Sequence, residues 1–242
     1  MTATVAAPRP KSLSRAAVVA VALLLSAAGV FLAAVWTPTG QRIDQWLLEL
    51  GRQVPATDIP PILRIDVVSS PLLWLAVAAV VVVLIQLRRF RARSDARRTL
   101  TVTAALIIFP PVAVLCARVL RDHVLTRPQL HDWIAETANS APSGHAAAVA
   151  AVAVVLVLAT PPRLRVLTTI VVGGWAAIIG LELIAAGWHR PSDVLISVLL
   201  VAAAGVLLPD PWRPSVRSHR TGQTTRSSDR PSDNREMLSA MS

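Results

Sequence analysis

Two histidines stand in short polar segments that interrupt an otherwise apolar chain. His145 closes the run Asn139–His145, and His189 precedes Asp193 by four residues. Residues four apart share a face of a helical turn, so Asp193 can accept the Nδ1 proton of His189 and leave Nε2 free as a nucleophile. His145 would supply a second imidazole, which titrates near neutrality and acts as acid and then as base. Alone, a His-Asp pair at this spacing is also typical of a plain hydrogen-bonded cap.

The residues around these histidines are suited to an anion. Pro142, Ser143 and Gly144 form a turn that opens a helix, where free N–H groups and the helix dipole attract negative charge. Arg121 and Arg127 add planar, permanently charged groups that fit phosphate oxygens, although each is equally typical of an anchor to lipid headgroups. Together the set predicts phosphoryl transfer through a phosphohistidine, with no metal and no cofactor.

The composition tells what kind of scaffold must position these residues. Of 242 residues, 54% are apolar and 16% are charged, whereas a soluble domain carries about a quarter charged residues. A single cysteine, Cys116, excludes a disulfide framework, and 10 glycines exclude collagen. The chain is therefore expected to be a polytopic membrane protein.

Six apolar stretches approach the length of about 20 residues that a helix needs to cross a bilayer. They are 16–36, 71–87, 99–117, 142–160, 166–187 and 191–208. The expected fold is all-α, a bundle of six transmembrane helices, with a cytoplasmic tail at 1–15, a membrane domain at 16–208 and a disordered basic tail at 209–242. The first stretch is read as a retained helix, with a signal peptide as the alternative.

The basic residues set the expected orientation. With the N-terminus inside, 17 of the 24 Lys and Arg residues fall on the cytoplasmic side, as the positive-inside rule requires. Both termini are then cytoplasmic, and both polar segments lie on the extracytoplasmic face. The formal charge of +10 is explained by this topology, so no nucleic-acid partner is predicted.

The first outer loop contains an amphipathic pattern. Ile43, Trp46, Leu47, Leu50 and Val54 recur at helical spacing, which predicts a helix in the outer membrane interface with Trp46 at headgroup depth. It would serve either as a simple lid over the helix ends or as a guide for substrate.

The chain resembles the type 2 phosphatidic acid phosphatase family, whose fold is shared with vanadium haloperoxidases. The family pattern is Lys-x6-Arg-Pro, then Pro-Ser-Gly-His, then Ser-Arg-x5-His-x3-Asp. Here the second block is intact at Pro142–His145, the third ends in His189 and Asp193, and the first ends in Arg127-Pro128. The resemblance covers residues 70–208.

The resemblance implies a role for each matched residue. His189 attacks phosphorus, Asp193 orients it, and His145 protonates the leaving oxygen and later activates water. The phosphoryl oxygens would be held by Arg127, Arg121, the Ser143 hydroxyl and the Gly144 N–H.

Two blocks depart from the family pattern. Leu120 stands where the first block has Lys; Arg121 follows one place later and is the expected replacement, and Arg118 lies two places earlier. Glu182-Leu183 replaces the Ser-Arg of the third block, which removes a cation and brings a carboxylate that repels phosphate. Glu182 could be protonated, pair with Arg118 or contact a cationic headgroup.

Arg190, next to the nucleophile, is the candidate to compensate for the lost cation, the alternative being an arginine that extends to the membrane interface. Activity is expected to be reduced.

The predicted function is a lipid phosphate or pyrophosphate phosphatase of the plasma membrane, and the strong Arg, Ala and Val bias suggests a bacterial source. The family's substrates include phosphatidic acid, phosphatidylglycerophosphate and polyprenyl diphosphates. Three alternatives remain: transfer of a phosphoryl-linked group between lipids, an impaired member that binds or translocates lipids, and a proton-coupled transporter. The physiological lipid and the oligomeric state are left open.

Overall fold

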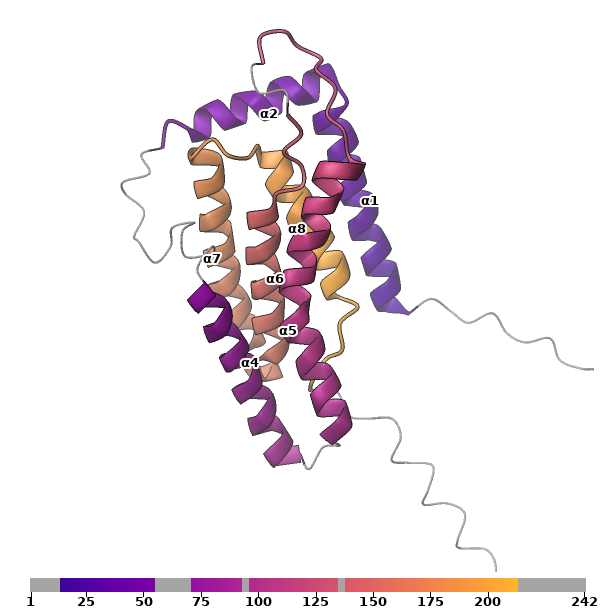
Figure 1. Cartoon of the computed structure of the whole chain (residues 1–242), viewed down its shortest axis with the longest axis vertical. Coiled ribbons are helices and arrows are strands. Elements are labelled where there is room, and N and C mark those ends of the chain that lie inside the picture. Colours follow the sequence, from indigo (N-terminus) through magenta and orange to yellow (C-terminus); the bar gives the residue numbers. More distant parts are fainter. Residues whose placement is uncertain (1–13, 55–70, 93–95, 135–137, 213–242) are drawn as a thin grey trace, which may run out of the picture. The chain divides into compact units, whose positions relative to one another are not determined.

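The computed structural model describes residues 14–54, 71–92, 96–134 and 138–212, and every regular element within these residues is helical (Figure 1). A π-turn, η3 (Leu120–Val124), extends α5, and a short 3-10 helix, η4 (Pro162–Leu164), precedes α7. The α-helices are α1 (Arg15–Val35), α2 (Pro38–Gly51), α4 (Pro71–Ala92), α5 (Ala96–Val119), α6 (Gly144–Ala159), α7 (Arg165–Ala185) and α8 (Pro191–Gly205).

The predicted all-α fold is confirmed, and each of the six apolar stretches forms a helix. Three helical segments are long and apolar enough to cross a membrane: α1, α5 continued by η3, and η4 continued by α7. The apolar parts of α4, α6 and α8 are shorter, so the number of six spans stays a prediction. Most of both predicted tails, 1–13 and 213–242, lies outside the described residues.

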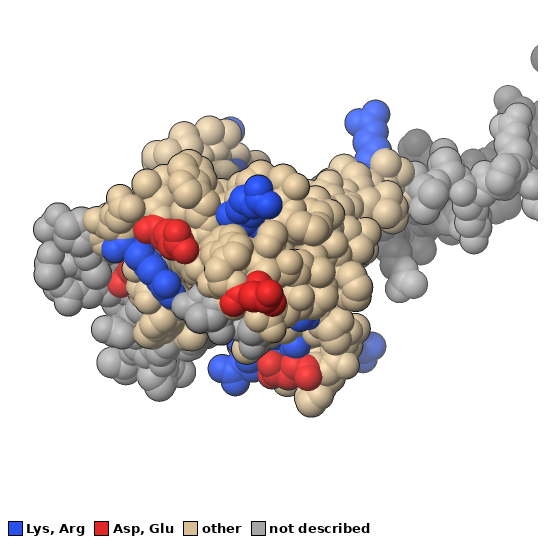
Figure 2. Space-filling view, turned by 90° about the horizontal axis from the view of Figure 1, so that it is seen from above, with Lys and Arg blue, Asp and Glu red and all other residues tan. Residues whose placement is uncertain are grey.

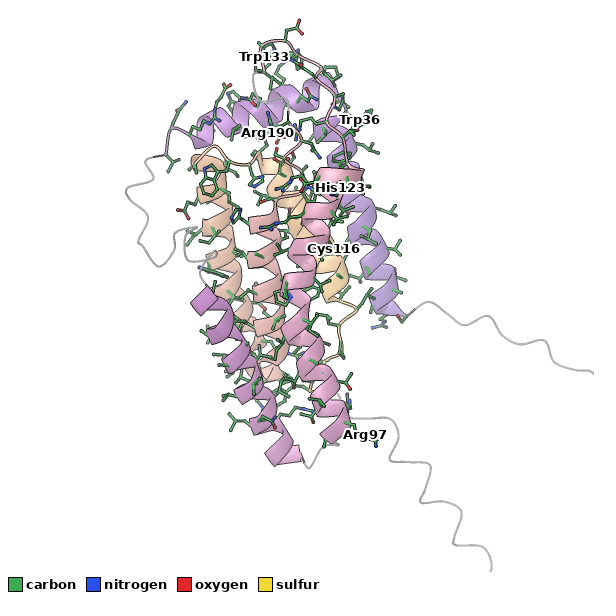
Figure 3. The ribbon with its side chains drawn as sticks, in the orientation of Figure 1. Trp36, Arg97, Cys116, His123, Trp133 and Arg190 are labelled. Carbon is green, nitrogen blue, oxygen red and sulfur yellow. The ribbon has the colours of Figure 1, made fainter. Side chains whose placement is uncertain are left out.

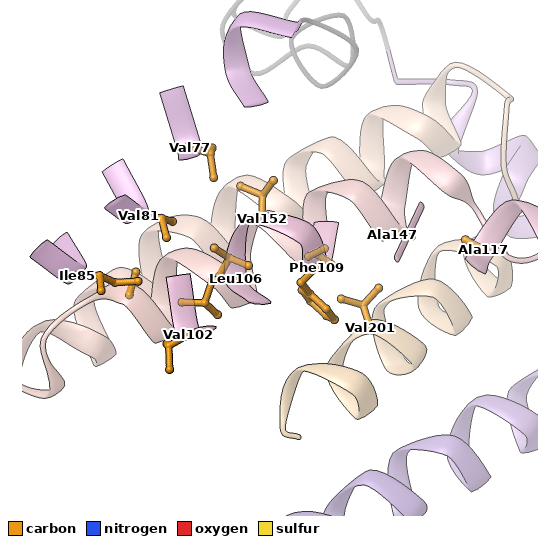
Figure 4. Close-up of a cluster of buried hydrophobic side chains, with 14 residues drawn as sticks. Val77, Val81, Ile85, Val102, Leu106, Phe109, Ala117, Ala147, Val152 and Val201 are labelled. Atoms are coloured by element: carbon orange, nitrogen blue, oxygen red, sulfur yellow. The ribbon is translucent and has the colours of Figure 1, made fainter. Parts of the chain in front are cut away.

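The core of the bundle is built around α6. This helix is rich in alanine and buries ten of its 16 residues, because small side chains let neighbouring helices approach closely. It packs against α5, α7 and α8, while α1 packs on α8 and α4 on α5. Figure 4 shows the main apolar cluster, in which Val81, Leu106 and Val152 join α4, α5 and α6.

The outer surfaces of the long helices are apolar. On α7, Val166 is 72% exposed and Ile170 is 67% exposed, and Leu25 on α1 is 68% exposed. Exposed aliphatic side chains in such numbers are unfavourable in water, at about 25 cal/mol per Å². These surfaces are therefore the expected contact with lipid, as in a membrane bundle.

One helix does not run with the bundle. Figure 1 shows α2 crossing the bundle at the end where α7 finishes and α8 begins. It starts at Thr37, whose hydroxyl accepts a hydrogen bond from Gly40 N at 3.0 Å, and Pro38 occupies the first helical position, where its missing N–H costs nothing. The predicted helix of the first loop is confirmed over Pro38–Gly51, and Val54 lies beyond its end; its place in the membrane interface stays a prediction.

The opposite end of the bundle is closed by basic residues. Arg165, at the start of α7, binds Asp210 through two N–H groups at 2.7 and 3.0 Å. Trp212 donates to the Ala159 carbonyl at 3.0 Å and Arg88 of α4 lies over its ring. In Figure 3, Arg97 marks this end, and Trp36 and Trp133 mark the end that carries α2.

Candidate active site

The two histidines predicted to act together do meet. His145 lies in the first turn of α6, and His189 lies in the turn between α7 and α8, yet their ring centroids are 6.5 Å apart. His189 is buried and His145 is half-buried. One phosphoryl group placed at their common edge can therefore contact both imidazoles.

Asp193 connects the segments around His189. It is fully buried, and its Oδ2 accepts hydrogen bonds from the Ser140 hydroxyl at 2.6 Å and from Arg190 N at 2.9 Å. His189 Nδ1 lies 3.7 Å from the same oxygen. At this distance the carboxylate acts on the ring as a charge, and a small approach would complete the hydrogen bond that fixes the tautomer.

Arg127 joins the first motif block to the third. Its Nη2 donates to Asp193 Oδ1 at 3.0 Å, and its side chain is 5% exposed. The Nε atom of Arg127 and Nδ1 of His189 are buried without a hydrogen-bond acceptor or donor among the described residues. A buried guanidinium N–H left in this state is costly, and an oxygen of a bound anion would satisfy it.

The predicted turn at the start of α6 provides the helix N-terminus. Ser143 is its N-cap: the hydroxyl accepts from Ala146 N at 3.2 Å, and the residue is fully buried. Ser143 N donates to the Asp193 carbonyl at 3.3 Å, and Ser197 Oγ donates to the Ser143 carbonyl at 3.0 Å. These bonds hold the turn against α8, next to the nucleophile that the resemblance implies.

The cations of the first block are arranged differently from what the spacing suggests. Arg121 forms an ion pair with its neighbour Asp122, Nε to Oδ1 at 2.7 Å. Arg118 instead lies over Gly144: a Cβ placed on this glycine would be 3.8 Å from Arg118 Cγ and 3.9 Å from its Nε. The π-turn accommodates one extra residue between Arg118 and Arg127, whereas Arg118 stands two places before the position of the family's Lys.

The substituted pair of the third block is buried in α7. Leu183 has no exposed surface and packs against Ala146 and Val194, so an apolar side chain fills the place where the family has its arginine. Its carbonyl accepts from Trp188 N at 3.1 Å and His189 N at 3.3 Å. Glu182 is also buried, at 7% exposed.

Arg190 is buried at the same end of the bundle (Figure 3). Its Nε donates to Gln45 Oε1 at 3.3 Å and its Nη1 to Ser140 Oγ at 3.5 Å. It lines a cavity of about 180 Å³ together with His189, Ser140, Trp188 and Leu48, the last from α2. The cavity lies beside His189, which forms part of its wall.

Helix α2 contributes to the site through a buried face that its apolar pattern did not predict. Its buried residues are Gln41, Asp44, Gln45 and Leu48, which recur at the helical spacing i, i+3, i+4 and i+7. This polar stripe lies opposite the apolar one, and the sequence contained the signal. Asp44 accepts from both the N–H and the hydroxyl of Ser192.

Seen from above, the surface is mostly uncharged, with both signs scattered over it (Figure 2). Among the described residues, no three His, Cys, Asp or Glu side chains gather as ligands for a metal ion.

Comparisons with known proteins identify the region that carries the site. Residues 122–215 match the model of the PAP2 superfamily, and this segment contains both histidines and Asp193. This segment of the chain is similar to the PAP2 superfamily. No curated protein matches the chain.

A solved structure shares the fold of this chain. The crystal structure described as the first transmembrane PAP2-type phosphatidylglycerolphosphate phosphatase from Bacillus subtilis superposes with a TM-score of 0.54, at 20% identity, over 78% of this chain and 93% of its own. The shared fold extends beyond the matched segment and includes helices that precede it.

Proposed function

We propose that the protein is an integral-membrane phosphatase that hydrolyses lipid phosphates or diphosphates on the extracytoplasmic face of the plasma membrane. The observation that carries the proposal is the meeting of His145 and His189 at the N-terminus of α6, with ring centroids 6.5 Å apart. A lipid substrate fits a site at the end of a bundle whose sides are apolar. The named activity of the Bacillus subtilis neighbour supports the same class of substrate.

The reaction would proceed in two displacements at phosphorus. Nε2 of His189 attacks, the bond to the leaving oxygen breaks, and His145 supplies the proton that this oxygen takes. His145, now neutral, accepts a proton from water as the water attacks the phosphohistidine, which releases phosphate and restores His189. Asp193 would hold the ring and stabilise its positive charge.

The charge on the phosphoryl oxygens would be met by fixed donors. The buried Nε of Arg127 has no hydrogen-bond acceptor among the described residues, and the N-terminus of α6 adds the Gly144 N–H. Arg121 remains a proposed contributor. We add Arg118, because its side chain lies over Gly144. Arg190 would partly replace the cation lost at Leu183.

The test is phosphate release by the purified protein in detergent micelles with a chelator present. Phosphatidic acid, phosphatidylglycerophosphate and a polyprenyl diphosphate form the substrate panel. We expect turnover of at least one, abolished in His189→Ala and in His145→Ala. His123→Ala is the matched control, because this histidine is exposed on η3.

A second measurement addresses the covalent step. Rapid quenching with ³²P-labelled substrate should trap an acid-labile, alkali-stable phosphoprotein, absent in His189→Ala. Turnover with no such species would contradict the phosphohistidine.

One observation favours a second candidate function. Leu183 is packed in the core and Glu182 is buried beside it, so this chain would bind phosphate less strongly than a member with Ser-Arg there. An impaired member that binds or translocates lipids would show no release across the panel while retaining lipid binding that depends on Arg127.

A further inference from the structure

Helix α2 lies outside the segment that matches the PAP2 model. It forms hydrogen bonds to two segments of the candidate site, one next to Arg127 and one between His189 and Asp193. Gln41 Nε2 donates to the carbonyl of Pro128 at 2.6 Å, next to Arg127, and Leu130 N donates back to Gln41 Oε1 at 3.4 Å. Three residues further along α2, Asp44 accepts from Ser192 N at 3.0 Å. One face of α2 therefore spans the gap between the first and the third motif blocks.

The same face continues along the turn that carries the nucleophile. Gln45 accepts from the Arg190 guanidinium at 3.3 Å, and Arg52, just past α2, donates to the Gly187 carbonyl at 3.5 Å. Gly187 has φ +74°, and an added Cβ would lie 2.5 Å from Arg52 Nε, so only glycine permits this approach. The turn from Gly187 to Ser192 is thus braced at several points by α2 and its end.

The rest of α2 divides into two further faces. At about 100° per residue, exposed Arg42 and Glu49 lie about a quarter turn from the docked face. Exposed Ile43, Trp46 and Leu50, at 53%, 59% and 47%, lie opposite the docked face. The charged face lies between the other two. This arrangement fits a helix with three different surroundings: the docked face contacts the bundle, the charged face contacts water, and the face opposite the bundle contacts an apolar environment.

The surroundings identify that apolar environment as lipid. Four of the seven tryptophans are exposed at this end of the bundle: Trp36, Trp46, Trp133 and Trp188. Tryptophan gathers where a membrane meets water. Trp36 also follows directly on α1, whose Leu32 and Leu25 are exposed, so the apolar face of α2 continues a surface expected to contact acyl chains.

We propose that α2 is an interfacial brace: its Ile43, Trp46 and Leu50 face rests in the outer headgroup region of the bilayer, and its Gln41, Asp44 and Gln45 face holds Arg127 and the His189–Asp193 turn in register. The positioning of Arg127 and of the His189–Asp193 turn rests on the proposed function, whereas the contact with lipid is independent of it.

The lipid contact is tested with the full-length protein in phosphatidylcholine–phosphatidylglycerol vesicles. Cys116 is exposed and is first replaced in Cys116→Ala. Single cysteines at Ile43, Trp46 and Leu50 then carry a nitroxide, with Arg42 and Glu49 as matched controls on the charged face. We expect the apolar set to collide with oxygen and to be shielded from a water-soluble nickel chelate, and the control set to show the reverse.

Two results would overturn the lipid contact. Equal nickel accessibility on both faces would mean that α2 is surrounded by water. Spin–spin broadening between copies at position 46 would mean that a second copy of the chain covers this face. Neither measurement depends on catalysis, so a failure of the proposed phosphatase leaves them readable.

The positioning role is tested with Asp44→Ala, Asp44→Asn and Arg42→Ala, using a short-chain phosphatidic acid in detergent so that membrane binding does not contribute. We expect kcat to fall about tenfold or more in Asp44→Ala, since small displacements of catalytic groups cost this much. Asp44→Asn keeps an acceptor for Ser192 N and should recover most of the loss, and Arg42→Ala should resemble the wild type.

Affinity for inorganic phosphate, followed by ³¹P NMR, supplies a readout without turnover. It should weaken in Asp44→Ala in parallel with kcat. A lower melting temperature with unchanged kcat, KM and phosphate affinity would show that α2 only stabilises the fold, and would overturn the positioning role.

Discussion

At the scale of single residues, the ion pair of Arg127 and Asp193 joins two motif blocks that lie 66 positions apart in the chain. Both side chains are almost completely buried. Removing one partner of such a pair leaves an uncompensated buried charge and typically costs 3–5 kcal/mol. The pair therefore fixes Arg127 at the carboxylate that His189 also approaches, and ties the loop before α6 to α8, so its loss is expected to affect both stability and catalysis.

Arg118 and Arg121 differ in their contacts: Arg118 lies over Gly144 at the N-terminus of α6, whereas Arg121 is paired with Asp122. We expect Arg118→Ala to lower kcat/KM by about 10- to 100-fold, the range for a lost charge-assisted hydrogen bond. Arg121→Ala should have a smaller effect, because this side chain is paired with Asp122 at the surface. Steady-state kinetics on one lipid phosphate checks the order, and a larger loss in Arg121→Ala would contradict it.

Substitution of Glu182 and Leu183 tests whether the departure from the family pattern in the third block limits activity. The double variant Glu182→Ser/Leu183→Arg restores the family pattern. We expect faster turnover, because a cation replaces a carboxylate near the phosphate, together with a lower melting temperature, because Leu183 packs without exposed surface against Ala146 and Val194. Phosphate release and thermal unfolding of the same sample report both effects. Unchanged turnover would mean that Arg190 and Arg118 already suffice.

At the scale of elements, the contact between α2 and α8 depends on one buried carboxyl. Burial raises the pKa of Asp44 above its ordinary value of 3.8, and the hydrogen bonds from Ser192 only partly offset this. A raised pKa in the folded state favours the protonated form. Asp44 therefore contributes its full stabilisation of the contact between α2 and α8 when the pH is below its ordinary pKa. This stabilisation is lost as the pH rises through the higher pKa of the folded state.

Asp44→Asn is expected to remove this part of the pH dependence, because an amide does not ionise. Melting temperatures in detergent, measured from pH 3.8 upward, should fall more steeply in the wild type than in the variant. Parallel curves would show that Asp44 does not control the docking of α2. Arg42→Ala, altered on the exposed face of the same helix, serves as the control and should follow the wild-type curve.

At the scale of the whole molecule, the arrangement of basic residues predicts the sidedness of the membrane domain. In a Cys116→Ala background, a cysteine at Trp133 should react with an impermeant maleimide on intact cells. A cysteine at Arg163, in the turn before α7 at the opposite end, should react only after permeabilisation. The reverse pattern would place the site on the cytoplasmic side, contrary to the excess of Lys and Arg assigned there.

Much of this molecule could be predicted from the sequence, because the relevant signals are local. A run of about 20 apolar residues forms a helix in lipid whatever surrounds it, and the blocks Pro142–His145 and His189–Asp193 show their chemistry by residue type and spacing. The meeting of the two histidines, inferred from their expected position on one face, is confirmed by the ring distance of 6.5 Å.

Tertiary structure alone decided three further points. Spacing along the chain predicted Arg121, whereas Arg118 lies over Gly144 and the π-turn at Leu120–Val124 follows it. Leu183 could be placed in the core only once its packing partners from α6 and α8 were known. The polar face of α2 acquired its meaning from Pro128 and Ser192, which are distant in sequence. Each point depends on contacts between remote segments, and these are fixed by packing in three dimensions rather than by local sequence.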